Sequence, residues 1–395
     1  MKKNIKLKID QIYKEIQKED SSEISLMGNE IGSIFFLHQL SKIDNSKEIL
    51  ITLNSKIEST FSKINNINHT TFSSGLSGIG WAYNYLFKHN VLNEDIESFL
   101  LQIDEIVENS VDKLFMLNDY DFLHGVIGQS VYLLERNNYK LLSKIINEID
   151  NNAIKNENGY CWISDFIIDD DMNSKKVYNI SLSHGNSAII VFLSKFLEIE
   201  SEDISSINKA KKILKEAVKF ILSCKMNNKD SIFPSICEVK NNGETRSSRL
   251  AWCYGDLGIG IALWQAGEIL RDDDIKKEAI ITCLHSTKRK TKEKTMIIDA
   301  GICHGTSGVA HIFNKMYYYT GKEEFKKAAN YWIEETLNMA TFKDGLAGYK
   351  SYQSEIMGGW KNDYGLLEGV AGIGLVLLSH ISDEKPTWDR CLLLS

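Results

Sequence analysis

The sequence predicts an all-α fold, an α/α toroid in which about seven helical hairpins form a double ring. Three observations predict it. A glycine-containing segment recurs along the chain, the stretches between its copies carry apolar residues at helical spacing, and the 395 residues include only two prolines. No Ser/Gly/Pro-rich linker separates one half from the other, so we expect a single domain over residues 1–395.

The recurring segment reads as Gly, two residues, usually a small residue, and then an apolar stretch at helical spacing. This pattern is typical of a loop that leads into the N-terminus of a buried helix. Successive copies lie about 50 to 70 residues apart, which is enough for an inner helix, a return helix and their loops. Two copies depart from the pattern, because Ile31 and Ala188 stand where the others have a second glycine. The seven copies are LMGNEIGSIFFL (from Leu26), SSGLSGIGWAYNYL (from Ser73), LHGVIGQSVYLL (from Leu123), SHGNSAIIVFL (from Ser183), CYGDLGIGIAL (from Cys253), CHGTSGVAHIF (from Cys303) and LEGVAGIGLVLL (from Leu367).

Two of the intervals are long enough for an insertion. They run over residues 129–180 and 190–248, and each can house a small extension or a β-hairpin. The second contains Asn241, Asn242 and Gly243, a combination typical of a hairpin turn.

Composition and charge exclude several classes of function. The formal net charge of −7 argues against nucleic acid or an anionic membrane as the main partner, and the basic run at residues 288–294 is expected to be a solvated loop. The N-terminal residues lack the apolar stretch of a secretory signal. The longest apolar run near the C-terminus, residues 370–378, is shorter than the roughly 20 residues that span a bilayer. We therefore expect a soluble cytoplasmic protein without a transmembrane segment.

The repeat predicts which side chains meet. If all copies share one geometry, the residues just before each first glycine lie at the same end of the toroid and point toward its centre. The position directly before that glycine holds His124, His184 and His304, and the position before that holds Cys253 and Cys303. The other residues directly before the glycine are Met27, Ser74, Tyr254 and Glu368.

Cys253, Cys303 and His304 are candidate ligands of one Zn²⁺ ion per chain. Two thiolates and an imidazole suit zinc in tetrahedral geometry, and three ligands leave the fourth position open, as in catalytic sites. A site with two thiolates is better suited to activating a thiol than to generating hydroxide. The seven cysteines are an odd number in a chain without a signal peptide, so a disulfide framework is not expected. We expect packing residues or surface thiols at Cys161, Cys224, Cys237, Cys283 and Cys391.

These motifs resemble those of a known family. WCYGDLGIG from Trp252 and ICHGTSGVA from Ile302 are similar to the two zinc motifs of the lanthionine synthetase C-like cyclases. SLSHGNSAI from Ser181 resembles their third signature, and the ending TWDRCLLLS resembles the family's C-terminus. The resemblance implies an α/α toroid with zinc at its centre, as in the stand-alone class I lantibiotic cyclases. It also implies Michael-type addition of a peptide Cys to dehydroalanine or dehydrobutyrine, which forms thioether rings.

The resemblance also implies roles for individual residues. Cys253, Cys303 and His304 match the zinc ligands, and His184 matches the histidine expected to be the principal acid/base residue. Three more residues match family positions: Asp121 would accept a proton or orient a donor, Arg249 would stabilise the developing enolate, and Tyr254 would support a ligand or the substrate. His124 and Glu368 match no essential residue and are expected to line the cavity.

The implied substrate is a dehydrated precursor peptide with its leader. Family members associate with a lantibiotic dehydratase and an ABC exporter, which would bring the protein to the inner face of the membrane. Two other functions remain open: a eukaryotic-type relative that binds glutathione or acts as a scaffold, and a zinc thiol prenyltransferase-like protein. A toroidal glycosidase would need two carboxylates facing one bond, and the in-register positions offer only Glu368.

Overall fold

The computed structural model describes residues 1–92, 95–167, 174–199, 203–227, 230–239, 246–355 and 358–395. Helices dominate the described residues, in agreement with the predicted class. The chain divides into two compact units. Unit 1 comprises Met1–His69, Ser73–Glu94 and Met296–Ser395, and unit 2 comprises Thr70–Phe72 and Asp95–Thr295.

Each predicted copy of the repeat leads into an inner helix. These helices are buried on all sides; in α10, for example, every residue from Asp256 to Gly267 is buried. Helices with an apolar surface all round belong in the interior of a protein, which explains why the copies lack the polar stripe of a surface helix. Unit 1 contains α2 (Ile31–Ile43), α4 (Leu76–Lys88), α13 (Thr306–Thr320) and α15 (Val370–Ile381), and unit 2 contains α6 (Val126–Glu135), α8 (Asn186–Glu198) and α10 (Asp256–Leu270).

The helices between the inner ones are amphipathic and cover them. In α7, for instance, the buried residues are Leu141, Leu142, Ile145, Ile146 and Ile149, which follow the helical period. Within the units, α3 packs on α2, α14 on α13, α7 on α6, α9 on α8 and α11 on α10. The outer helices of unit 1 are α1 (Lys2–Ile16), α3 (Lys47–Lys63) and α14 (Glu323–Asn338), and those of unit 2 are α5 (Glu97–Met116), α7 (Tyr139–Asn152), α9 (Ile204–Ser223) and α11 (Asp273–Ser286). Shorter helical segments are η1 (Ile64–Asn66), α12 (Lys292–Thr295) and η3 (Trp388–Leu392).

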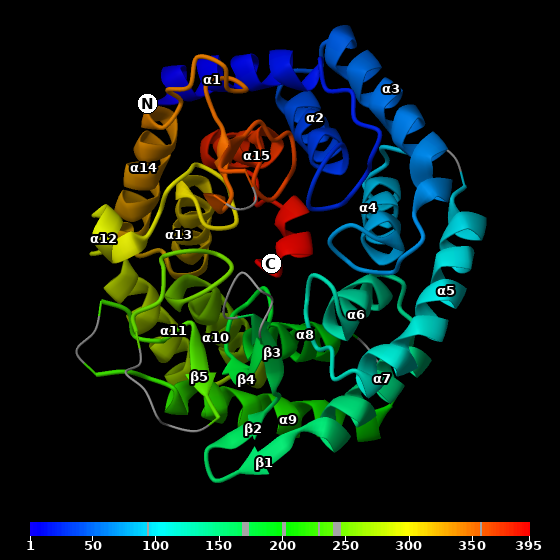
Figure 1. Cartoon of the computed structure of the whole chain (residues 1–395), viewed down its shortest axis with the longest axis vertical. Coiled ribbons are helices and arrows are strands. Elements are labelled where there is room, and N and C mark those ends of the chain that lie inside the picture. The colour runs from blue at the N-terminus through cyan, green and yellow to red at the C-terminus, as the bar shows by residue number, and fades with distance from the viewer. Residues whose placement is uncertain (93–94, 168–173, 200–202, 228–229, 240–245, 356–357) are drawn as a thin grey trace. The chain divides into compact units, whose positions relative to one another are not determined.

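The last inner helix takes its outer partner from the other end of the chain. α15 packs against α1, which buries Ile5, Ile9, Ile12 and Ile16 at helical spacing (Figure 1). No helix of comparable length follows α15 in the described residues. The repeat alone predicts a return helix after α15. In the structure, the N-terminal helix α1 takes that place in unit 1.

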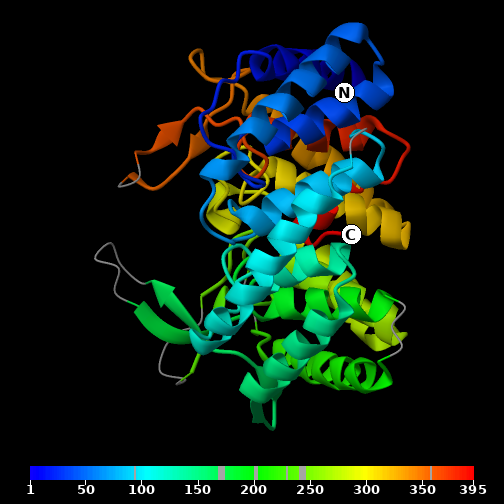
Figure 2. The same ribbon diagram turned by 90° about the vertical axis from the view of Figure 1, so that its right-hand side faces the viewer.

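Short strands occupy the places where insertions were predicted. β1 (Ile154–Asn156) pairs with β2 (Gly159–Cys161), and β3 (Ser164–Ile167), β4 (Ser174–Asn179) and β5 (Ile236–Glu238) form an antiparallel sheet. In unit 1, β6 (Ser351–Tyr352) and β7 (Trp360–Lys361) form a further pair, drawn in orange in Figure 2. The hairpin turn predicted at residues 241–243 lies outside the described residues.

A buried ion pair anchors η3 to α13 in unit 1. Asp389 is fully buried, and its Oδ2 lies 3.0 Å from Lys315 Nζ and 2.7 Å from His311 Nε2. Burial alone would raise the pKa of Asp389, but the charge of Lys315 and the hydrogen bond to His311 hold it well below its usual value. Asp389 therefore stays ionised at neutral pH and fixes the C-terminal segment to the helix that begins directly after His304 and Gly305.

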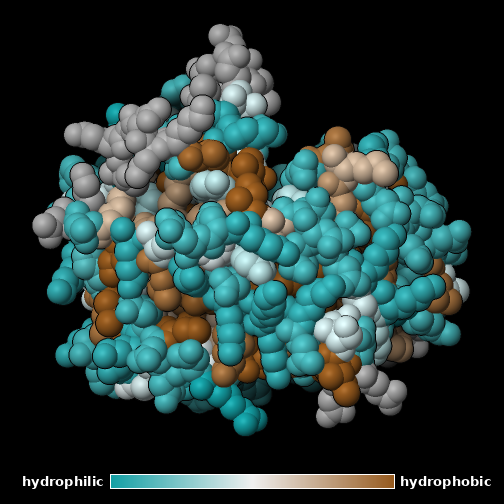
Figure 3. All heavy atoms as spheres, turned by 90° about the horizontal axis from the view of Figure 1, so that it is seen from below, coloured by the Kyte–Doolittle hydropathy of each residue, from teal (hydrophilic) through white to brown (hydrophobic). Residues whose placement is uncertain are grey.

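The surface is mainly polar on the side that Figure 3 draws. On the face drawn in Figure 3, hydrophilic residues predominate and hydrophobic ones gather in separate patches. Among the described residues, no helix combines the length and the apolar character needed to cross a bilayer.

Candidate metal and catalytic site

The loop before each inner helix is built around a glycine. From the second copy to the seventh, the first glycine is the N-cap residue of the helix. The second glycine is required by close packing, because a Cβ at Gly308 would overlap the carbonyl oxygen of Ile302, and one at Gly372 would overlap that of Leu366. The fourth copy keeps the same N-cap geometry although Ala188 replaces the second glycine. The first copy does depart, since its N-cap is Glu30 with φ of 63°.

A polar residue six positions before the glycine closes this loop. The Oδ1 atoms of Asp119, Asp299 and Asp363 accept hydrogen bonds from the main-chain N–H two residues later, at 3.2, 3.1 and 2.6 Å. Asn179 does the same for Ser181 at 3.0 Å. The main-chain oxygen of each Asp also accepts the N–H of the first helical residue. Such Asx turns are local structure. We did not predict these residues, although the spacing Asp/Asn-x₅-Gly in the third, fourth, sixth and seventh copies is a visible signal.

Main-chain hydrogen bonds join neighbouring loops in register. In unit 1, Cys303 N–H donates to Leu367 O at 2.9 Å, Leu367 N–H to Met27 O at 2.8 Å, and Met27 N–H to Ser73 O at 2.9 Å. In unit 2, Ser183 N–H and Leu182 N–H donate to Cys253 O. Within each unit, the positions just before the first glycine are therefore neighbours, as the repeat predicts.

In unit 2 the predicted acid/base residue meets its predicted partner. His184 Nδ1 lies 2.5 Å from Asp121 Oδ2, and both side chains are largely buried. The other carboxylate oxygen of Asp121 accepts the main-chain N–H groups of Leu123 and His124, at 2.7 and 2.9 Å. The His124 ring stacks beside that of His184, with centroids 6.3 Å apart. Asp121 is thus held rigidly and fixes the orientation of the His184 imidazole.

This pairing sets the charge on both groups. Burial alone would lower the pKa of His184, but the hydrogen bond and the charge of Asp121 raise it on balance, with smaller contributions from Cys253 and Asp119. Burial would raise the pKa of Asp121, yet its contact with His184 lowers it overall. The pair therefore favours an imidazolium beside a carboxylate.

Tyr254 and Arg249 lie in the loop before α10 of the same unit. The Tyr254 ring is 5.8 Å from that of His184, and its hydroxyl accepts a hydrogen bond from Asn179 Nδ2 at 3.4 Å. Arg249 is half-buried and stands six residues before Gly255, where four other copies have Asp or Asn. A guanidinium cannot accept the hydrogen bond that closes those loops. The fifth loop must therefore be held in another way.

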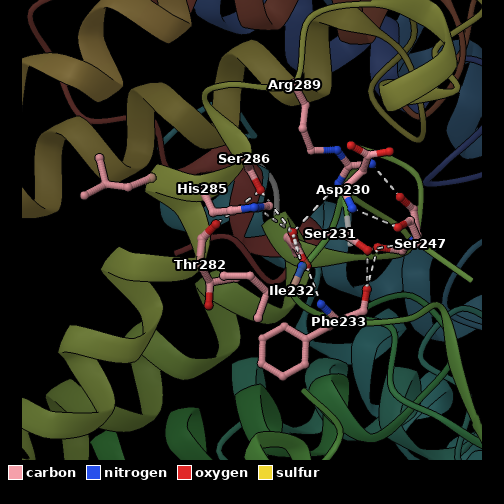
Figure 4. A network of polar contacts seen from close by, with 12 residues as sticks. Asp230, Ser231, Ile232, Phe233, Ser247, Thr282, His285, Ser286 and Arg289 are labelled. Carbon is pink, nitrogen blue, oxygen red and sulfur yellow. Dashed lines mark hydrogen bonds and ion pairs between the residues drawn. The ribbon is translucent and has the colours of Figure 1, made fainter. Parts of the chain in front are cut away.

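A buried polar network supplies the missing support (Figure 4). The Arg289 guanidinium, which is 2% exposed, donates to the main-chain oxygens of Ser248 and Lys294. The main-chain N–H of Ser248 in turn donates a hydrogen bond to Ser231 Oγ at 2.8 Å. Leu250 N–H donates to Thr295 O at 2.9 Å. The residues on both sides of Arg249 are therefore fixed. The predicted solvated loop at residues 288–294 is correct for its exposed lysines but wrong for Arg289, which is buried because it satisfies these carbonyl groups.

In unit 1, Cys303 and His304 lie at the loop before α13. Both side chains are half-buried. His304 Nε2 is 3.6 Å from Asp299 Oδ2, and its Nδ1 is 4.0 Å from Glu368 Oε1. Glu368 therefore lies beside a candidate ligand, as expected for a residue that lines the cavity. Cys253, the remaining candidate ligand, lies in unit 2 and is buried.

The other cysteines occupy different surroundings. Cys161, Cys283 and Cys391 are buried, and burial raises the pKa of each, that of Cys161 to about 12. Cys224 and Cys237 are half-buried, and a hydrogen bond between the two thiols raises the pKa of Cys224. The raised pKa values keep the thiols protonated at neutral pH in four cysteines, Cys161, Cys224, Cys283 and Cys391, which agrees with packing roles.

Comparison with known proteins gives a consistent result. A family model described as "Lanthionine synthetase C-like protein" matches residues 22–393. Among curated proteins, the chain is 27% identical over 427 residues to the "Nisin biosynthesis protein NisC" of Lactococcus lactis subsp. lactis, and the alignment covers 100% of this chain and 96% of that protein.

The solved structures include a similar fold. A structure named "Nisin cyclase" matches with a TM-score of 0.75 at 23% identity, and the match covers 100% of this chain and 97% of the other. The likeness confirms the predicted fold class, an α/α toroid.

Proposed function

The chain belongs to the lanthionine synthetase C-like family, and from this premise we propose that it is a zinc-dependent lanthionine cyclase. It would add Cys thiolates of a lantibiotic precursor peptide to dehydroalanine or dehydrobutyrine and so form thioether rings. The curated relative and the similar structure carry names of nisin biosynthesis and nisin cyclisation. These names favour a peptide cyclase over a glutathione-binding scaffold or a thiol prenyltransferase.

The observation that carries the proposal is the donor set formed by Cys253, Cys303 and His304. Cys253 and Cys303 stand two residues before the first glycine of their copies, and His304 stands directly before its glycine. Two thiols and one imidazole fit zinc in the chemistry of their donors, and one coordination position would stay open. A zinc ion bound there would hold the incoming peptide Cys as a thiolate, which is the nucleophile for the addition.

Residues of unit 2 would donate the proton that completes the addition. As the new C–S bond forms, the C=C π bond of the dehydro residue opens and the electron pair moves toward the α-carbon and its carbonyl group. His184 would then protonate the α-carbon, because Asp121 occupies Nδ1 and the imidazolium can donate from Nε2. Deprotonation of the peptide thiol supplies a proton to the site, so the overall reaction conserves protons.

Arg249 and Tyr254 would stabilise charge around this step. Arg249 occupies a position that in four copies closes the loop, and Arg289 and Thr295 hold the adjoining main chain instead. This exchange leaves the Arg249 guanidinium available for the developing enolate oxygen. Tyr254, next to Cys253 and beside His184, would donate to the substrate or to a ligand sulfur.

The proposal includes three partners: a dehydrated precursor peptide with its leader, a dehydratase that makes it, and an ABC exporter that removes the product. We place the protein in the cytoplasm, with peripheral attachment to the membrane through these partners. We also propose that residues 1–395 act as one catalytic domain, because a single family model matches residues 22–393.

The test combines metal analysis with a peptide assay. The purified chain should contain one zinc ion, and incubation with a dehydrated precursor peptide should remove thiols that an alkylating reagent can label, without a change in peptide mass. Mass spectrometry measures both quantities. A chain that binds no zinc and leaves every thiol open to alkylation would refute the proposed function.

The His184–Asp121 pair leads to a prediction about pH. A general acid must be protonated, so the rate should fall as pH rises through the pKa of His184. Asp121 raises that pKa, and replacing it by Asn should move the alkaline limb of the rate profile to lower pH. The measurement is the cyclisation rate across pH for both proteins. An alkaline limb at the same pH in Asp121→Asn would contradict the assigned role of the pair.

A further inference from the structure

Asp299 differs in its surroundings from the other residues that close the repeat loops. Its carboxylate is 1% exposed, and Oδ1 accepts the main-chain N–H of Gly301 at 3.1 Å, as in the other copies. Its Oδ2 accepts the main-chain N–H of Tyr352 in β6 at 2.9 Å and lies 3.6 Å from His304 Nε2. The second oxygen thus has neighbours that the closing of the loop does not need.

The fourth copy shows what loop closure alone requires. Asn179 occupies the equivalent position and makes the equivalent hydrogen bond with its amide oxygen. An amide is therefore sufficient for closure, so the negative charge of Asp299 is not needed for that hydrogen bond. The imidazole of His304 lies close to this carboxylate, with Nε2 3.6 Å from Oδ2.

We propose that Asp299 is a positioning residue of the metal site, which accepts a hydrogen bond from His304 Nε2 and so directs Nδ1 to the metal. The inference rests on the proposed zinc site. Carboxylates that hold the second nitrogen of a ligating histidine fix its tautomer and raise its basicity. The hydrogen bond from Tyr352 holds the carboxylate in turn, so the β6–β7 pair takes part in the support of the ligand.

The experiment compares Asp299→Asn with Asp363→Asn. Asp363 closes the loop of the next copy in unit 1 through Gly365 N–H, and the residue directly before its glycine is Glu368 rather than a histidine. Both variants keep an amide able to close the loop. Zinc affinity is measured on the full chain by competition with a chromogenic chelator, and the thermal unfolding of the metal-free proteins checks that each variant folds.

We expect Asp299→Asn to bind zinc about 10- to 100-fold more weakly than the wild type, and Asp363→Asn to bind it like the wild type. Asp299→Glu, which restores a carboxylate, should recover part of the affinity. Equal affinity in Asp299→Asn and the wild type would overturn the inference while leaving the zinc site intact. Equal weakening in both Asn variants would also overturn it, since loop closure would then be the cause. A wild-type chain that binds no zinc would refute the proposed function as well.

Discussion

Replacement of His184 by Asn is expected to lower the rate of cyclisation by about 10²- to 10⁴-fold, with zinc retained. The Asn amide can keep a hydrogen bond to Asp121, so the loop should be preserved, but it supplies no proton near neutral pH. Addition of the thiolate would then lack its proton donor. The rate is measured by mass spectrometry of alkylated peptide after timed incubation, together with the zinc content of the variant.

His124→Asn is the matched control. His124 precedes its glycine as His184 does and stacks beside it, but its side chain is not the one that binds Asp121 Oδ2. We expect a rate within about tenfold of the wild type, because a residue that only lines the cavity contributes less than a proton donor. Full activity in His184→Asn would rule out His184 as the acid. An equal loss in both variants would point to packing of the two rings instead.

Cys303→Ala is expected to bind zinc so weakly that the purified protein contains little of it, and to lose cyclisation. Removing a ligand should cost more than the roughly 10- to 100-fold loss that follows removal of a group that only supports one. Metal content by elemental analysis and the alkylation assay measure the two effects. Treatment of the wild type with a strong chelator should reproduce the loss of activity, and added zinc should restore it only in the wild type.

Cys224→Ala controls for the loss of a thiol as such. Cys224 is half-buried like Cys303, but it lies at the end of α9 and contacts Cys237. Its zinc content and rate should match those of the wild type. If Cys303→Ala kept one zinc ion per chain, Cys303 would not be a ligand, and the assignment of His304 beside it would also fail.

The repeat made much of this architecture predictable. A glycine followed by an apolar helical stretch indicates a buried helix, and six such glycines are indeed N-cap residues. Because the loops share one geometry, sequence alone could place His184 near Tyr254 and His304 near Glu368. The roles of these residues in catalysis stay predictions, since they depend on substrate and metal.

Other features could not be predicted from the sequence, because they depend on contacts between segments that are distant along the chain. Arg289 belongs to a basic run that the sequence predicts to be solvated. It is buried because its guanidinium donates hydrogen bonds to the main-chain oxygens of Ser248 and Lys294. The support of Asp299 by Tyr352 joins residues 53 positions apart, and the short strands around Tyr352 give no clear alternation. Glu30 has a φ of 63°, which its residue type does not favour, and it contacts Glu19 and Lys63 from other segments.

The pairing of α1 with α15 has a consequence for synthesis of the chain. Unit 2 is nearly continuous in sequence, so its internal contacts can form during translation. Unit 1 cannot complete its core until residues 370–381 have left the exit tunnel, because α1 would otherwise expose Ile5, Ile9, Ile12 and Ile16. α1 therefore waits for its partner until α15 has been made. Cys303 and His304 belong to this unit, so we expect the two candidate ligands to be held in place only after α15 has folded.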